Sequence, residues 1–274
     1  MTKRVLLVAL LILTPLSAAW GVMPASWHHS TEADFAKGKT EGTTVSSRGE
    51  VSLTRAVRLL MPSSEAPAVI AAAAVMEDTV YAASGVDNVV YRIAEGKAAR
   101  FAAPPADILT CLRAEGESLL LGAGGKGAGV YRIHAGGAVE LIWSDESVKY
   151  VWDIVPGPNG ELYVATGPAA GVYEVTGNNQ GRRLFDARKL AQNILCLAVG
   201  SDGLLYAGTD QEGLVLEIDP EQGVGRVLLD AQEKEIAALI PGSDEDLYVA
   251  TSDAARASKD GSMAPATTNS GRSD

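Results

Sequence analysis

The sequence is poor in the side chains on which many enzyme active sites depend. Only 3 histidines and 2 cysteines occur among 274 residues. So few histidines give little support to acid–base catalysis by imidazole. The spacings GxSxG and HExxH are absent, as is the spacing of an EF-hand calcium loop. These absences exclude the common serine hydrolases, zinc proteases and EF-hand proteins that carry those motifs.

Basic and aromatic residues are also scarce. Lys and Arg number 23 against 34 Asp and Glu, which gives a formal charge of −11 and a pI near 4.8. Binding to a nucleic-acid backbone needs clustered Lys and Arg, so a nucleic-acid partner is excluded. Aromatic residues make up 5%, whereas 29 glycines suit a fold with many turns. With 47% hydrophobic residues, the chain can still bury the core of one large all-β domain.

The first nineteen residues have the features of a cleaved signal peptide. Lys3 and Arg4 form a basic start, Val5–Leu16 is apolar, and Ser17–Ala19 places small residues before a cut at Trp20. The apolar run is short for a membrane span, which needs roughly 20 residues. We therefore expect an extracytoplasmic protein, periplasmic or secreted, with no membrane insertion after cleavage. Loss of the two basic residues changes the formal charge from −11 to −13.

A repeat of about 42 residues dominates the rest of the chain. Its most complete copy, residues 151–185, has four short apolar segments separated by turn residues such as Asn159-Gly160. The first anchor position is held by Tyr81, Leu121, Tyr163, Tyr206 and Tyr248. A second anchor, ten residues later, is held by Tyr91, Tyr131, Tyr173 and Leu216. Four strands recurring at this interval predict an all-β fold, the β-propeller.

The predicted domain organisation follows from this repeat. We expect a signal peptide (1–19), an irregular N-terminal arm (20–42), a β-propeller (43–252) and a disordered tail (253–274). The last repeat has only two strands, so we predict five four-stranded blades, the last closed by N- and C-terminal strands. An N-terminal hairpin, 43–46 with 51–54, would fill the gap, although 56–60 competes for the same place. The span 43–251 holds 209 residues, close to five repeats of 42.

The two cysteines are expected to be buried free thiols. Cys111 and Cys196 stand ten residues before an anchor, as does Asp153, and the equivalent positions in the first and last blades are read as Ala71 and Ala238. Cysteines at the same position of two blades that are not neighbours are too far apart for a disulfide, which needs Cα atoms within about 7 Å.

Candidate ligand-binding residues gather on one rim of the predicted propeller. They are Tyr150, Trp152, Asp153, Asp87, Asn88 and Asp210. Loops between blades and loops between second and third strands share this rim, and those loops are longer than the hairpins of the opposite face. Asp153, near the channel, could bind a cation or a polar ligand. The alternative is that it hydrogen-bonds the backbone of the neighbouring blade.

The segments PGPNGELYVATGPAAGVYEV and GSDGLLYAGTDQEGLVLEI resemble exported bacterial β-propeller repeat proteins of the WD-like, NHL-like and two-component-regulator-propeller type. The resemblance covers residues 68–251, and more weakly 34–60, and it implies a fold more than an activity. We expect a non-catalytic extracytoplasmic binding or scaffold protein without a cofactor, whose partner is a protein or a small polar ligand. The alternative is a metal-dependent hydrolase similar to the gluconolactonases, with a divalent cation at the channel mouth. There Asp153 would be the main ligand, helped by Asp87, Asn88 and Asp210. A third possibility is a truncated form of a longer protein.

Overall fold

The computed structural model describes residues 31–35, 38, 41–54, 59–61, 66–243 and 246–253. The predicted signal peptide, much of the predicted N-terminal arm and nearly all of the predicted tail lie outside these residues. The chain divides into two compact units, Met1–Arg58 and Leu59–Asp274. In the part of the chain that the structure describes, no helix is long and apolar enough to span a membrane.

The first unit contains a short helix, α2 (Glu32–Phe35), and an antiparallel hairpin, β1 (Thr43–Val45) and β2 (Val51–Leu53). The hairpin is as predicted. The helix was not predicted, because four residues are too short for a periodic pattern. Thr31 supplies its start, since both its backbone N–H and its hydroxyl donate to Asp34 Oδ2 at 3.0 Å.

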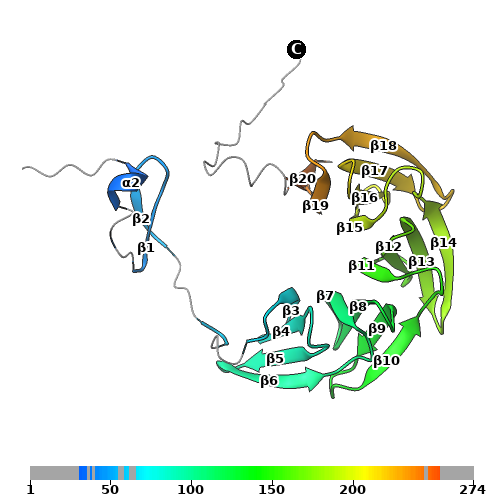
Figure 1. The fold of residues 1–274 in the computed structure, drawn as a ribbon, viewed down its shortest axis with the longest axis horizontal. Helices are drawn as coiled ribbons and strands as arrows, with labels where there is room; N and C mark the ends of the chain where they lie inside the picture. Colours follow the sequence, from blue (N-terminus) through cyan, green and yellow to red (C-terminus); the bar gives the residue numbers. More distant parts are fainter. Residues whose placement is uncertain are drawn as a thin grey trace, which may run out of the picture. The chain divides into compact units, whose positions relative to one another are not determined.

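The second unit is an arc of blades (Figure 1), and the four strands of each complete repeat pair in chain order. A single residue pair, Tyr150 with Gly124, also joins blades 2 and 3 into one eight-stranded sheet. Blade 1 comprises β3 (Ile70–Met76), β4 (Thr79–Ser84), β5 (Val90–Ala94) and β6 (Lys97–Ala102). Blade 2 comprises β7 (Ile108–Glu115), β8 (Ser118–Gly124), β9 (Gly129–Ile133) and β10 (Val139–Trp143). Blade 3 comprises β11 (Tyr150–Pro156), β12 (Leu162–Gly167), β13 (Gly171–Gly177) and β14 (Gln180–Asp186). Blade 4 comprises β15 (Ile194–Val199), β16 (Leu205–Thr209), β17 (Leu214–Asp219) and β18 (Val224–Asp230), and β19 (Glu235–Pro241) and β20 (Leu247–Ser252) begin blade 5.

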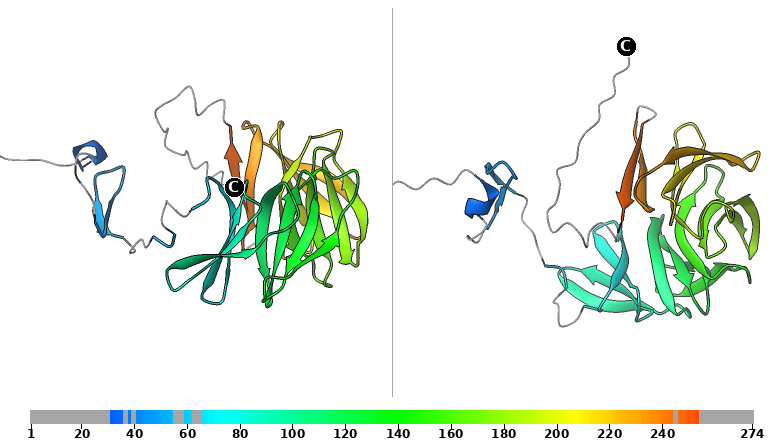
Figure 2. Two further views of the ribbon diagram at one scale, coloured as in Figure 1. Left: turned by 60° about the horizontal axis from the view of Figure 1, so that its bottom comes forward. Right: turned by 45° about the horizontal axis from the view of Figure 1, so that its top comes forward.

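Each blade runs from an inner first strand to an outer fourth strand, and the twisted sheets stand side by side (Figures 1 and 2). The core lies between neighbouring blades. Tyr163 of blade 3 packs with Leu205 and Leu216 of blade 4, for example, in one buried cluster. Burial of the two faces of successive sheets against each other explains why the inner strands are apolar on both sides.

Strand pairing corrects the repeat alignment at two positions. The first anchor pairs with a charged residue of the third strand in four blades: Tyr81 with Arg92, Leu120 with Arg132, Tyr163 with Glu174 and Tyr206 with Glu217. The anchor of blade 2 is therefore Leu120, not Leu121. Cys111, Asp153, Cys196 and Ala238 do hold one register position, but its member in blade 1 is Ala72, not Ala71.

Closure of the ring by the N-terminal hairpin is not among the strand pairs of the described residues. β1 and β2 pair only with each other there, and β19 and β20 form a sheet of two. The β-propeller fold is confirmed, whereas the predicted number of five complete blades is not. Four blades have all four strands.

Candidate functional site

The predicted rim carries a pair of stacked aromatic rings. Tyr150 and Trp152 of β11 have ring centroids 5.1 Å apart and an interplanar angle of 22°. Residues two apart along a strand point to the same face, as these two rings do. A β-bulge between Val151 and Asp153 leaves Trp152 without a paired residue on β12. Both rings are half-buried, so part of each remains open to solvent.

The indole ring is fixed by a polar relay from blade 4. Trp152 Nε1 donates to Asn193 Oδ1 at 2.9 Å, and Asn193 Nδ2 donates to Asp210 Oδ2 at 2.5 Å. The other oxygen of the Asp210 carboxylate accepts the backbone N–H groups of Gln192 (3.1 Å) and Asn193 (2.8 Å). Asp210 is thus a buried carboxylate with its oxygens occupied, and it positions Asn193. We call Tyr150, Trp152, Asn193 and Asp210 the rim site.

Two glycines make room for the side chains of the rim site. A Cβ on Gly124 would overlap the Tyr150 ring, and one on Gly167 would overlap Asn193 Oδ1. These glycines end the second strands of blades 2 and 3, so each blade leaves space for a side chain at the start of the next first strand. Gly167 also precedes Pro168 through a cis peptide bond.

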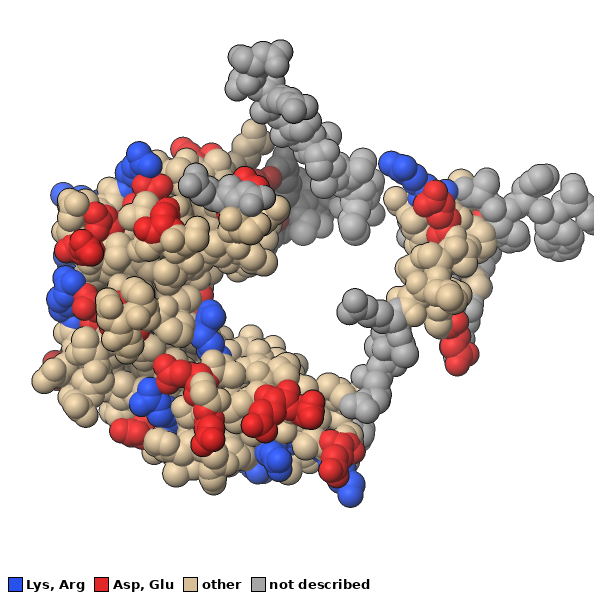
Figure 3. Space-filling view, turned by 180° about the vertical axis from the view of Figure 1, so that it is seen from behind, with Lys and Arg blue, Asp and Glu red and all other residues tan. Residues whose placement is uncertain are grey.

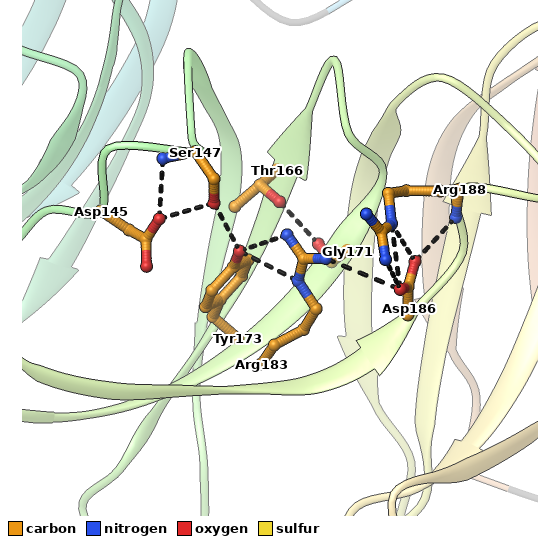
Figure 4. Close-up of polar contacts among 8 residues, drawn as sticks. All are labelled: Asp145, Ser147, Thr166, Gly171, Tyr173, Arg183, Asp186 and Arg188. Atoms are coloured by element: carbon orange, nitrogen blue, oxygen red, sulfur yellow. Dashed lines mark hydrogen bonds and ion pairs between the residues drawn. The ribbon is translucent and has the colours of Figure 1, made fainter.

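A hydrogen-bonded network supports the rim on its outer side (Figure 4). The Tyr173 hydroxyl lies 3.2 Å from Ser147 Oγ and accepts from Arg183 Nε (3.0 Å) and Nη2 (2.7 Å). Asp145 is hydrogen-bonded by Ser147, which lowers the pKa of that carboxyl. Together these contacts tie the loop before Tyr150 to β13 and β14.

The same network continues into the loop before Asn193. Arg188 donates twice from Nε to the Asp186 carboxylate, at 2.9 and 3.0 Å, and Arg183 Nη1 lies 3.6 Å from Asp186 Oδ2. The hydrogen bond from Arg188, followed by the charges of both guanidinium groups, lowers the pKa of Asp186 to about 2. The two loops that carry the rim site are therefore both anchored on blade 3.

A cavity of about 490 Å³ opens beside this network. It is lined by Pro168, Arg188, Lys189, Leu190, Ala191, Gln192, Gln211 and Glu212. Gln211 Nε2 donates to Gln192 Oε1 at 2.8 Å across it. The cavity therefore combines amides, one basic side chain engaged with Asp186, and an exposed lysine, next to the relay that holds Trp152.

Asp153 hydrogen-bonds the backbone of the neighbouring blade, which was the alternative to a role in ligand binding. Its Oδ1 accepts the N–H of Ile154 at 2.8 Å, and its Oδ2 accepts the N–H of Leu197 in blade 4 at 2.9 Å. Arg113 of blade 2 lies 3.7 Å from Oδ1. Burial nevertheless raises the pKa of this carboxyl, against the lowering effect of the hydrogen bond from Leu197 and the charge of Arg113. Asp153 links three successive blades.

The remaining predicted residues, Asp87 and Asn88, lie apart from the rim site in the turn between β4 and β5. The N–H of Asp87 donates to Ser84 Oγ at 3.0 Å. Asn88 has a positive φ of 55°, and its buried Oδ1 lacks a hydrogen-bond partner within the described residues. Of the predicted residues, the structure thus brings Tyr150, Trp152 and Asp210 together, and it adds Asn193, a single Asn outside any sequence motif.

The opposite face holds a larger groove, of about 740 Å³, between blades 3 and 4. Its acidic lining residues are Glu161, Glu174, Asp202, Asp219 and Glu221, with Arg182 as the basic one. Internal donors already occupy carboxylates here. Asp202 accepts from Leu204 N (3.0 Å) and the Tyr206 hydroxyl (2.9 Å), for example. The acidic side chains of the groove are thus largely accounted for by the hydrogen bonds of the turns that form it.

Neither surface charge nor clusters of metal-binding side chains point to a second site among the described residues. On the face shown in Figure 3, basic side chains are interspersed with acidic ones and form no continuous patch over the blades. Among the residues that the structure describes, no group of three or more His, Cys, Asp or Glu side chains is placed to hold a metal ion.

Known structures similar to this chain are β-propellers. No family model and no curated protein matches the sequence. A virginiamycin B lyase from Staphylococcus aureus aligns with a TM-score of 0.56 at 17% identity, over 66% of this chain and 63% of that chain. The extracellular domain of BT4673 from B. thetaiotaomicron aligns at 0.56 and 14%, over 70% and 27%. The WD40 β-propeller domain of Doa1 aligns at 0.54 and 11%, over 66% and 60%.

The chain spans about three-fifths of the length of the lyases that it matches. Identities of this size show a shared architecture and no shared chemistry. What the chain has in common with these proteins is the β-propeller fold.

Proposed function

We propose that this protein is a non-catalytic, extracytoplasmic binding protein that holds a small polar ligand or a protein segment at the rim of blades 3 and 4. The observation that carries the proposal is the Tyr150–Trp152 stack, fixed by Asn193 and Asp210 beside the 490 Å³ cavity. A polar relay that orients an aromatic ring before binding reduces the ordering cost of association. Half-buried aromatic rings beside amide groups suit a ligand with both apolar and hydrogen-bonding parts.

Among the described residues, no contact favours a metal-dependent hydrolase over a binding protein. Asp153, the carboxylate that a channel-mouth cation would need, already accepts a hydrogen bond at each oxygen. Metal analysis of the purified protein distinguishes the two. A stoichiometric divalent cation that is lost in Asp153→Ala would favour the hydrolase.

The binding proposal is tested by panning a phage-displayed peptide library on the purified protein, together with a panel of soluble saccharides. The variant Tyr150→Ala removes half of the stack, and we expect it to weaken binding at least tenfold, since an aromatic contact contributes about 1 kcal/mol or more beyond its buried area. The matched control, Asp202→Asn, lies on the opposite face and should bind normally. Binding unchanged in Tyr150→Ala but lost in Asp202→Asn would move the site to the acidic groove.

A further inference from the structure

The turn between β11 and β12 exposes an Asn-Gly sequence. It closes with a hydrogen bond from Gly157 N–H to Glu161 O, at 2.8 Å, and Gly160 has a positive φ of 90°. A carboxylate oxygen of Glu161 accepts the N–H of Asn159 at 3.0 Å, so the backbone of the turn is held. The Asn159 side chain is exposed, and among the described residues no hydrogen bond engages its amide. A Cβ built on Gly160 would meet no described atom within 4 Å, so this side of the turn is open to water.

The equivalent turn of blade 4, between β15 and β16, has a carboxylate in the same place. Asp202 stands where Asn159 stands in blade 3, and the glycine that follows it, Gly203, has a φ of 80°. Here the side chain is held on both oxygens. Oδ1 accepts the N–H of Leu204 at 3.0 Å, and Oδ2 accepts the hydroxyl of Tyr206 at 2.9 Å. The two turns share a backbone but differ in whether the side chain before the glycine is restrained.

The other asparagines that the structure describes lack the following glycine. Each precedes a residue whose side chain hinders access to the next backbone nitrogen, whereas glycine has no side chain. Two of them are also restrained, since Asn179 Oδ1 accepts the N–H of Ser144 at 2.9 Å and Asn193 belongs to the rim site. The residues are Asn88, Asn178, Asn179 and Asn193. Among the described asparagines, Asn159 therefore stands alone in combining exposure, an unrestrained amide and a following glycine.

We propose that Asn159 is a site of spontaneous deamidation. The backbone nitrogen of Gly160 attacks Cγ of Asn159 and forms a new C–N bond, while the side-chain amide leaves as ammonia with the proton of that nitrogen. The product is a cyclic succinimide. Water then adds to either carbonyl carbon of the succinimide and opens the ring to an aspartate or an isoaspartate. The first step is intramolecular, so it needs only that the two reacting groups of adjacent residues approach each other.

Deamidation changes the acidic groove on this face of the propeller. Asn159 and Gly160 both line the groove of about 740 Å³, together with acidic side chains such as Glu161 and Asp202 and the basic Arg182. An aspartate adds a negative charge there, which makes the groove less favourable for anions and more favourable for cations. An isoaspartate adds the same charge and also lengthens the main chain of the turn between β11 and β12.

Peptide mapping of the folded full-length protein during incubation at mildly alkaline pH tests the proposal. In the wild type we expect the mass increase of deamidation to appear several-fold faster in the peptide that contains Asn159 than at the other described asparagines. Electron-transfer fragmentation identifies the isoaspartate. Isoelectric focusing should show a more acidic band that grows at the same rate. Asn159→Gln should remove both signals, because a glutamine side chain is one carbon longer and cyclises much more slowly.

The matched control is Asp202→Asn, which places Asn-Gly in the equivalent turn of blade 4. An amide at this position can still accept the N–H of Leu204 and donate to the hydroxyl of Tyr206, so it remains restrained. We expect position 202 of this variant to deamidate more slowly than Asn159 in the same molecule. The comparison separates the effect of an unrestrained side chain from that of the Asn-Gly sequence itself.

Each other outcome overturns the proposal. Asn159 could stay unmodified during an incubation in which a synthetic peptide of the same sequence reacts, and the folded turn would then prevent cyclisation. Equal rates at Asn159 and at position 202 of Asp202→Asn would show that restraint of the side chain has no part in the selectivity. Faster conversion at another of the described asparagines would assign the modification to a different segment.

Discussion

At the residue scale, the side chain with the most structural consequence is Asp153. It accepts a hydrogen bond from the next blade and faces Arg113 of the previous one, while its burial raises its pKa. A carboxyl whose folded-state pKa is raised stabilises the fold most when it is protonated. That contribution is fully present below the ordinary Asp value of 3.8 and is lost as pH rises through the folded pKa.

Asp153→Asn should therefore cost stability to a degree that depends on pH. At pH 7 we expect a loss of about 1–3 kcal/mol, because an amide can accept only one of the two backbone N–H groups that the carboxylate accepts. The difference between wild type and variant should widen as pH falls towards the ordinary Asp value, since only the wild type gains from protonation there. Urea unfolding at several pH values measures this difference. A variant equal in stability to the wild type at every pH would contradict the role of Asp153 as a connector.

Cys111 and Cys196 are free, as expected, and their surroundings predict low reactivity. Burial, and then the charge of Asp153, raises the pKa of both thiols to about 12. Because the thiolate is the reactive form, native protein at pH 7 to 8 should react with Ellman's reagent far more slowly than a free thiol. After unfolding without reductant, mass spectrometry should find two alkylated cysteines. Fast labelling of the native protein, or an unlabelled pair after unfolding, would contradict this assignment.

At the scale of elements, strand positions could be predicted from the sequence wherever turn residues and alternating apolar residues agreed. Asn159-Gly160 and similar turns separate strands cleanly, so the strands of the four complete blades could be predicted. The anchor of blade 2 was misplaced by one residue because Leu119, Leu120 and Leu121 are all apolar and fully buried, which removes the alternation that defines register. In blade 1, Met76 and Thr79 close a shorter turn than that of blade 3, which shifts the equivalent position from Ala71 to Ala72.

The candidate site was less predictable than the elements that carry it. Tyr150 and Trp152 stand out in the sequence because aromatic residues are scarce. Asn193 does not, since its partner Trp152 is 41 residues away and only the packing of blade 4 on blade 3 brings them together. Asp153 had the right position for a ligand, but whether its oxygens were free depended on the backbone of another blade. Contacts between blades thus determine the site, and one repeat read alone does not contain them.

At the scale of the whole molecule, the stability of a propeller depends on each blade being covered by the next. Leu184 and Leu228 hold the same register position, yet their exposed fractions are 6% and 46%. Leu184→Ala should cost about 2–5 kcal/mol, as expected for a buried leucine in a core that cannot fully relax. Leu228→Ala, at the exposed counterpart, should cost much less, measured by urea unfolding of the full chain.

A double-mutant cycle then shows that the cover of Leu184 comes from the next blade. Leu184 and Leu216 of blade 4 lie in one buried cluster, so Leu184→Ala and Leu216→Ala should couple by about 1–3 kcal/mol. Leu119→Ala serves as the control, because Leu119 lies in a different cluster and its cost should simply add to that of Leu184→Ala. Additive effects of Leu184→Ala and Leu216→Ala would contradict a core that the two blades share.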